Sequence, residues 1–162
     1  MKKKILTLTL TVVLLFALTF SLTSCGSAQT FTIANLSIEL NSSYFDIASM
    51  VPVGEEVETF AAYMSLFEGL IVIPTFAPNT YDLSFSEYID NYSSYMDGGI
   101  SYYGDIPVVS YEQEADGNVF TVEAYIYEDE GGFWVVAFMN IYGDITEKSE
   151  TILGYVDSIV IE

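Results

Sequence analysis

The sequence contains no histidine and no arginine, and it has one cysteine and one tryptophan in 162 residues. The absence of histidine excludes Ser-His-Asp and Cys-His catalytic arrangements and histidine-bearing zinc sites. The absence of arginine excludes the bidentate clamp that often holds phosphate groups. Carboxylates, hydroxyls and lysine are what remains for chemistry. We therefore expect no enzyme activity, no catalytic residues and no cofactor.

Basic residues are scarce beyond the N-terminus. Lys2, Lys3 and Lys4 open the chain, which leaves Lys148 as the single base among 23 acidic residues that all follow Cys25. Such a surface repels nucleic-acid phosphates and has no basic cluster to release counterions, so DNA and RNA are excluded as partners. It attracts cations, and we expect a cationic protein, a cationic peptide or a divalent cation. A surface charged only for solubility is the alternative.

The N-terminus has the layout of a secretory signal. Three lysines precede residues 5–20, which are uncharged and mostly apolar, and a segment of this kind is removed rather than folded. An uncleaved membrane helix is the alternative, because residues 5–25 are uncharged and long enough to cross a bilayer. Threonine and serine dilute this run, which favours the cleaved signal.

The residues Leu22-Thr23-Ser24-Cys25 resemble the lipobox of bacterial lipoprotein signals, an aliphatic residue and two small residues before a cysteine. The resemblance implies cleavage between Ser24 and Cys25, a diacylglyceryl thioether on the Cys25 sulfur and a palmitate-like acyl anchor. It implies attachment to the extracytoplasmic face of the cell membrane, with the lipid bilayer as partner. Two acyl chains anchor stably where one is marginal. Lipidation also explains a lone cysteine, which forms no intramolecular disulfide.

These features divide the chain into three parts. Residues 1–24 are the signal peptide, and residues 25–30 form a short lipidated tether of small and polar residues. Residues 31–162 have the size of a single compact domain, which is acidic and is expected to be stabilised by its apolar core alone.

Alternating apolar residues predict short strands in residues 31–40, 59–65 and 70–76. The last two strands are expected to join around Glu68-Gly69, and Pro74 places the second of them at an edge or a bulge. Residues 41–54 read as irregular.

One helix is predicted from its first turn. Ser84-Phe85-Ser86-Glu87 is a capping box, in which the Ser84 hydroxyl accepts from the Glu87 amide and the Glu87 carboxylate reaches back. An apolar stripe follows at helical spacing, and Gly98-Gly99 ends the helix. The stripe consists of Phe85, Tyr88, Ile89, Tyr92 and Met96.

Residues 100–141 carry the strongest strand pattern. Asp116-Gly117 is typical of a type I′ hairpin turn, which predicts the pairs Tyr111–Val122, Val109–Ala124, Ser110–Glu123 and Glu112–Thr121. A turn at residues 129–131 predicts the pairs Ile126–Trp134, Ala124–Val136 and Val122–Phe138. These strands are apolar on both faces, so the sheet needs cover on both sides.

The C-terminus completes an α+β chain. Asp144 and Glu147 are expected to cap a second helix with Ile152, Leu153 and Val156 as its buried stripe, and residues 158–162 form a last strand. This order of elements, together with Gly131-Gly132-Phe133-Trp134, resembles the PsbP-like sandwich, a fold that small bacterial lipoproteins of unknown function share. The resemblance implies a mostly antiparallel sheet covered by helices on both faces. It implies no function and carries no site residue.

One motif resembles a calcium loop. Glu112, Glu114 and Asp116-Gly117, with Glu123 at the twelfth place, match the spacing of acidic ligands in that loop. Glutamate replaces aspartate at its first and third positions, and the flanks are strands, so a plain hairpin explains Asp116-Gly117 without metal. A calcium-binding envelope domain that uses the four acids remains an alternative function.

Two further hypotheses concern carboxylates and aromatic residues. A carboxylate-dependent hydrolase needs only two suitably spaced acids, and 23 acids supply such pairs by chance. Six aromatic residues either form an exposed patch that binds a glycan or peptide, or pack in the core and across strands. They are Tyr102, Tyr103, Tyr125, Tyr127, Phe133 and Trp134. The sequence thus predicts a membrane-anchored, non-catalytic binding or accessory module of the cell envelope.

Overall fold

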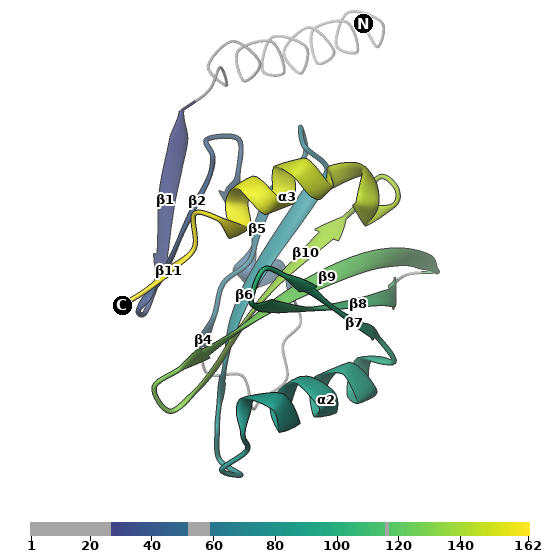
Figure 1. Cartoon of the computed structure of the whole chain (residues 1–162). Helices are drawn as coiled ribbons and strands as arrows, with labels where there is room; N and C mark the ends of the chain where they lie inside the picture. Colours follow the sequence, from purple (N-terminus) through teal and green to yellow (C-terminus); the bar gives the residue numbers. More distant parts are fainter. Residues whose placement is uncertain (1–26, 52–58, 116) are drawn as a thin grey trace, which may run out of the picture.

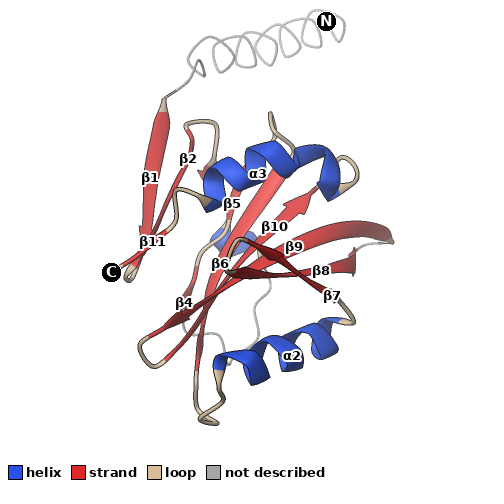
Figure 2. Ribbon diagram, in the orientation of Figure 1, coloured by secondary structure: helices blue, strands red, loops and turns tan. Residues whose placement is uncertain are grey.

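The computed structural model describes residues 27–51, 59–115 and 117–162. This part of the chain forms two antiparallel sheets and two α-helices (Figures 1 and 2). The small sheet has the order β1-β2-β11. The large sheet has the order β3-β5-β6-β10-β9-β8-β7, with β4 also paired to β6. The predicted α+β class and the predominantly antiparallel sheet are confirmed.

The bounds of the elements are as follows. The strands are β1 (Ala28–Ile33), β2 (Leu36–Asn41), β3 (Phe45–Asp46), β4 (Thr59–Phe60), β5 (Tyr63–Ser65), β6 (Leu70–Pro78), β7 (Gly99–Tyr103), β8 (Ile106–Ala115), β9 (Asn118–Asp129), β10 (Gly132–Asn140) and β11 (Val160–Ile161). The helices are α2 (Phe85–Met96) and α3 (Ser149–Val156), with the 3-10 turns η1 (Ala48–Met50) and η2 (Ile145–Lys148).

Helix α2 begins as its sequence predicts. Ser84 is the N-cap, its hydroxyl accepts from the Glu87 amide, and the Glu87 carboxylate accepts from the Ser84 amide at 2.9 Å. The Ser84 hydroxyl also donates to the Glu87 carboxylate at 2.6 Å, and this bond, followed by the one from the Ser84 amide, lowers the pKa of Glu87. The helix ends at Asp97, which adopts the left-handed conformation expected of a glycine. Gly98 is needed next to it, because a Cβ there would lie 2.8 Å from a methyl group of Val109.

The first hairpin has the predicted register. Val109 pairs with Ala124, Tyr111 with Val122, and Glu112 with Thr121. Asp116 lies outside the described residues, but the pairing of Ala115 with Asn118 leaves only a two-residue turn.

The second hairpin is shifted by one residue from the prediction. Trp134 pairs with Tyr127 rather than Ile126, because the turn has two residues, not three, and Gly132 joins the strand opposite Asp129. Gly131 provides the positive φ of that turn. A Cβ on Gly132 would overlap the Ala77 carbonyl of β6, so glycine allows this close pairing. Because neighbouring residues of a strand point to opposite faces, this shift of one residue places each β10 side chain on the face opposite to the predicted one, relative to β9.

The large sheet carries an apolar core on each face. Helix α2 covers one face (Figure 1), where its Ile89 packs with Val109, Ala124, Ile126 and Val135. The other face belongs to the main core, which joins the large sheet to α3 and the small sheet. Representative members of this core are Leu36, Ile38, Trp134, Val136, Phe138, Ile152 and Val156. The expectation of cover on both sides is confirmed.

Predicted strand 59–65 is interrupted opposite Pro74. β4 and β5 pair with β6 in one continuous register, and the Ala61 amide donates to the Pro74 carbonyl at 3.0 Å. Proline has no amide hydrogen to donate back to Ala61, so the hydrogen bonding between the two strands is interrupted here. β6 itself continues through Pro74 between two neighbours, which corrects the expectation of an edge or bulge. Within residues 41–54, Asn41 ends β2, and the rest of the described part is irregular apart from β3 and η1.

The N-terminal boundary of the domain differs from the prediction. β1 begins at Ala28, so residues 28–30, assigned to the tether, are part of a strand paired with β2. Gln29 and Thr30 are exposed there, as an edge strand permits. The tether before the fold is therefore shorter than expected.

The C-terminal helix also has a modified start. Asp144 caps η2, its carboxylate accepting from the Thr146 amide at 2.9 Å, and α3 follows from Ser149. Glu147 contributes its backbone amide, which donates to the Asp144 carbonyl. Ile152 and Val156 are buried as predicted, and Leu153 is half-buried.

A polar network fastens the small sheet to the large one at Trp134, which is fully buried. The indole Nε1 donates to Asn35 Oδ1 and Asp129 Oδ2, both at 3.2 Å. Asn35 Nδ2 donates to the same Asp129 oxygen at 2.8 Å. Chiefly the bond from Asn35 lowers the pKa of Asp129.

We predict that Asp129→Asn lowers the free energy of unfolding by about 1 kcal/mol at pH 7. Because the folded-state pKa of Asp129 is lowered, its contribution is complete above the unfolded value of about 4 and is lost as pH falls through the folded value. Urea unfolding from pH 7 down to about pH 2.5 should therefore show the gap to wild type narrowing. Glu130→Gln, at an exposed neighbouring position, is the control. An equal gap at every pH would contradict this role of Asp129.

Candidate functional site

An acidic groove lies where β8 loses its neighbour. β7 pairs with β8 only as far as Ser110, so the following residues of β8 form a free edge in the described part of the chain. The groove has a volume of about 590 Å³. Four acidic residues line it, from the end of α2, from β8, from β9 and from the start of η2: Asp97, Glu112, Glu123 and Asp144.

Local bonds fix two of these carboxylates. Asp144 Oδ1 accepts from the amide and the hydroxyl of Thr146, each at 2.9 Å, and these bonds lower the pKa of Asp144. Glu123 Oε2 accepts from the Tyr125 hydroxyl at 3.0 Å. Burial and the nearby Glu123 raise the pKa of Tyr125, so this hydroxyl stays protonated and continues to donate.

The rest of the lining is mixed. The Thr121 hydroxyl accepts from the Ile145 amide at 2.7 Å, which holds η2 against β9. Met96 and Tyr111 add apolar surface. An acidic rim with apolar walls suits a cation on an aliphatic stem, the chemistry of a lysine or arginine side chain.

The predicted calcium ligands are only partly brought together. Glu112 and Glu123 line the groove and share one hairpin face with Glu114, as the register predicts. Among the described residues, no group of three or more acidic or cysteine side chains is placed to hold a metal ion. Asp116 lies outside these residues, so calcium binding by the full set stays a prediction.

The six aromatic residues do not form one patch. Phe133 stacks on Tyr88 of α2, with ring centroids 4.1 Å apart, whereas Trp134 and Tyr125 are buried in the core on the opposite face. Tyr102 is exposed on the edge strand β7. Tyr103 and Tyr127 are half-buried against the main core. Core packing therefore explains most of the set.

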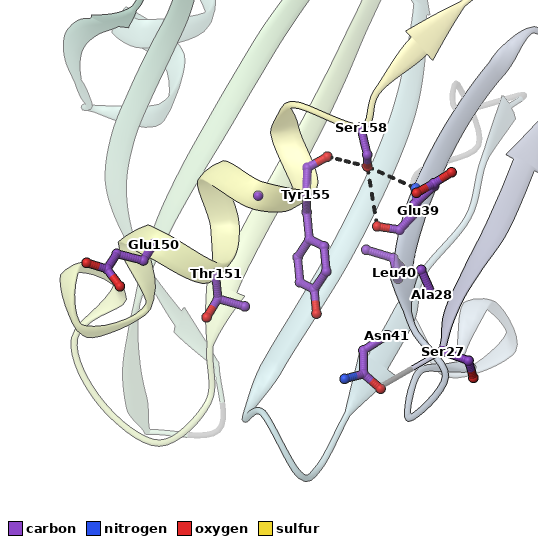
Figure 3. A pocket seen from close by; sticks show the side chains of 10 residues that line it. Ser27, Ala28, Glu39, Leu40, Asn41, Glu150, Thr151, Tyr155 and Ser158 are labelled. Atoms are coloured by element: carbon purple, nitrogen blue, oxygen red, sulfur yellow. Dashed lines mark hydrogen bonds between the residues drawn. The ribbon is translucent and has the colours of Figure 1, made fainter. Parts of the chain in front are cut away.

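A second groove, of about 420 Å³, lies between β2 and α3 (Figure 3). Ser158 joins its two walls: its hydroxyl accepts from the Glu39 amide at 3.0 Å and lies 2.6 Å from the Tyr155 carbonyl. Glu39 and Glu150 stand at its opposite sides, and Ser27, the first described residue, lies at its lower end (Figure 3). This groove therefore adjoins the point where the tether enters the fold.

Cys25, the predicted lipid attachment residue, lies outside the described residues. No helix in the described part of the chain has the length and apolar character to span a bilayer.

Three described carboxyl groups have lowered pKa values: Glu87, Asp129 and Asp144. Each accepts hydrogen bonds that favour its charged form. The carboxylate-dependent hydrolase stays an alternative prediction.

Comparisons with known proteins identify the fold of the chain but not its function. No protein-family model matches the chain, and no curated protein matches it by sequence. A crystal structure from Bacteroides thetaiotaomicron matches with a TM-score of 0.54 and 10% identity, over 80% of this chain but 46% of that one. Cyanobacterial PsbP from Synechocystis matches with a TM-score of 0.52 and 8% identity, over 86% of this chain and 98% of that one. A mutant of the protein Mog1 has a TM-score of 0.52 and 6% identity, over 84% and 96% of the two chains.

The fold is PsbP/Mog1-like. The chain spans less than half of the Bacteroides structure but nearly all of the PsbP and Mog1 structures. The PsbP-like resemblance of the sequence is thus confirmed at the level of architecture. Identities of 6–10% do not extend to function.

Two tyrosines of β9 make a matched pair for mutation. The Tyr127 hydroxyl is buried without a hydrogen-bond partner among the described residues, whereas the Tyr125 hydroxyl donates to Glu123. We predict that Tyr125→Phe lowers the free energy of unfolding by about 1 kcal/mol and that Tyr127→Phe leaves it unchanged or raises it. Urea unfolding of both variants measures this. Equal losses would show that Tyr127 has a partner.

Proposed function

We propose that this chain is an extracytoplasmic lipoprotein, held on the cell membrane by acyl chains on Cys25, and that its domain is a non-catalytic binding or accessory module. Its acidic groove takes a cationic group of a protein or peptide partner. The observation that carries the proposal is the gathering of Asp97, Glu112, Glu123 and Asp144 around one groove, in a chain with a single base beyond its leader.

The anchor is supported by the sequence and by the start of the fold. Cys25 follows two small residues at the end of an apolar leader. The fold begins immediately after it, because the Ser27 carbonyl already accepts from the Ser42 amide at 3.1 Å. Two residues span at most about 7 Å, so a lipidated Cys25 holds the domain against the bilayer surface.

Electrostatics supports a cationic partner. Several carboxylates around a partly enclosed groove concentrate negative potential, which raises the local concentration of cations and speeds their association. The bonds from the amide and the hydroxyl of Thr146 lower the pKa of Asp144, which favours its charged form. The groove walls from Met96 and Tyr111 accept the aliphatic part of such a group.

Acidic side chains outside the groove would attract cations too, so the test must separate the groove from net charge. One double variant, Glu112→Gln with Glu123→Gln, changes the groove. The other, Glu128→Gln with Glu130→Gln, changes exposed residues at the C-terminal end of β9 and in the turn after it. Both double variants remove two negative charges. Glutamine at position 123 keeps an oxygen that accepts from Tyr125.

We predict that the groove double variant binds a fluorescein-labelled peptide of alternating lysine and alanine about three- to tenfold more weakly than wild type. Fluorescence anisotropy with the mature protein measures the Kd. The distal double variant should change it less than about twofold. Wild-type binding should weaken as sodium chloride rises from about 0.05 M to about 0.5 M, because salt screens exposed charges. Equal effects of both variants would reject the groove as the site.

A further inference from the structure

Three exposed apolar residues lie on two adjacent turns at one end of the molecule. Leu66 and Phe67 occupy the turn between β5 and β6 and are 56% and 80% exposed. Tyr142, after β10, is 69% exposed. We call these three residues the apical apolar cluster. Single exposed apolar residues are ordinary, but a group from adjacent turns at one end indicates an interaction surface.

The two turns are held together. The Ile141 amide donates to the Gly69 carbonyl at 2.8 Å, and the Gly69 amide donates to the Ser65 carbonyl at 2.8 Å. Gly69 has a φ of +70°, and a Cβ at this position would overlap the ring of Tyr142. Tyr142 therefore lies directly against the turn that carries Leu66 and Phe67.

The same turn is bonded to the point where the tether enters. The Ser65 hydroxyl lies 2.7 Å from the Ser43 hydroxyl and accepts from the Glu68 amide at 3.1 Å. One residue before Ser43, the Ser42 amide donates to the Ser27 carbonyl. Figure 1 shows the start of β1 and the β5–β6 turn at the same end of the molecule.

The charge of this turn is directed inward. Glu68 is its acidic residue, and Glu68 Oε2 accepts from the Tyr44 hydroxyl at 2.9 Å and the Tyr155 hydroxyl at 2.7 Å. Burial and Glu68 raise the pKa of both tyrosines, so both hydroxyls remain donors. The carboxylate is thus half-buried and held by hydrogen bonds, while the apolar side chains point out.

We propose that the apical apolar cluster inserts into the lipid surface to which Cys25 is anchored. The inference rests on the proposed lipid anchor and adds a second, apolar contact that fixes the orientation of the domain. Cys25 is two residues from Ser27, so the acyl chains enter the bilayer beside this end. A chain with one base beyond its leader has no electrostatic attraction to anionic headgroups, so its second contact must be apolar. Tyrosine and phenylalanine suit the interface between headgroups and acyl chains.

The test places tryptophan in the cluster and at the opposite end of the domain. Phe67→Trp is compared with Tyr81→Trp, each in the lipidated protein on phosphatidylcholine vesicles with bromine on the acyl chains. Tyr81 is 84% exposed and lies beyond the far end of β6, about 30 Å away along the strand. The native Trp134 is buried in the core of both variants and provides the same background.

We expect brominated lipid to quench the tryptophan introduced by Phe67→Trp at least about twofold more strongly than the one introduced by Tyr81→Trp. The emission of the Phe67→Trp variant should also shift to shorter wavelength on vesicles. Vesicle flotation is measured on the same samples. If the protein fails to float, the lipid anchor is wrong and the proposed function falls with it. If it floats and the Phe67→Trp variant is quenched no more than the Tyr81→Trp variant, the anchor stands and the docking proposal is overturned.

A second pair of variants tests the energetic role. Leu66→Ser with Phe67→Ser should speed the transfer of the lipidated protein between vesicles about tenfold or more, because two apolar side chains no longer leave water. Tyr81→Ser should leave the transfer rate unchanged. Equal rates for both variants would contradict insertion of the cluster.

Discussion

The architecture depends on a central strand that is apolar on both faces. In β10, Trp134, Val136 and Phe138 point to one face and Phe133 and Val135 to the other, and all five are buried. Such a strand is stable only when both sides of the sheet are covered. Helix α2 covers one side, and α3 with the small sheet covers the other. A single cysteine forms no disulfide within the chain that could replace this burial, so stability rests on the apolar core.

Both faces of the large sheet are covered, and among the surfaces that stay open in the described part of the chain are the strand ends and the free edge of β8. The acidic groove forms at that edge, where α2 ends and η2 begins. The start of β1 and the apical apolar cluster lie at the end of the molecule that carries the β5–β6 turn (Figure 1). Carboxylates differ between these regions: Glu68 is turned inward onto two tyrosines, whereas Glu112 is exposed beside the groove. The separation fits a molecule with one end on lipid and another surface open to a charged partner.

Local chemistry makes some elements predictable. The capping box of Ser84 and Glu87 involves residues three apart, and the two-residue turn after Ala115 determines the register of the first hairpin. The prediction for the second hairpin is one residue out of register. The choice of a two-residue turn there depends on the close approach of β6 to Gly132, which belongs to a distant part of the sequence. That single shift also decides which aromatic residues share a face.

Long-range contacts account for the rest of what the sequence does not predict. The last strand is predicted from residues 158–162, but its pairing with β2 is not, because the two partners lie almost a whole chain apart in the sequence. Hairpin register predicts Glu112 and Glu123 as neighbours, but Asp97 and Asp144 join them only because two helical segments end and begin there. The sequence likewise does not predict that Leu66 and Phe67 are exposed, because two adjacent apolar residues normally indicate a buried position.

The central claim of this account is the covalent lipid on Cys25, because it places the domain at a membrane and gives the apolar end its bilayer. Intact-mass analysis of the protein extracted from its native membrane tests the claim directly. The account predicts a chain that begins at residue 25 and carries a diacylglyceryl group on the sulfur. A free thiol at residue 25, or a leader still joined to the chain, would contradict it.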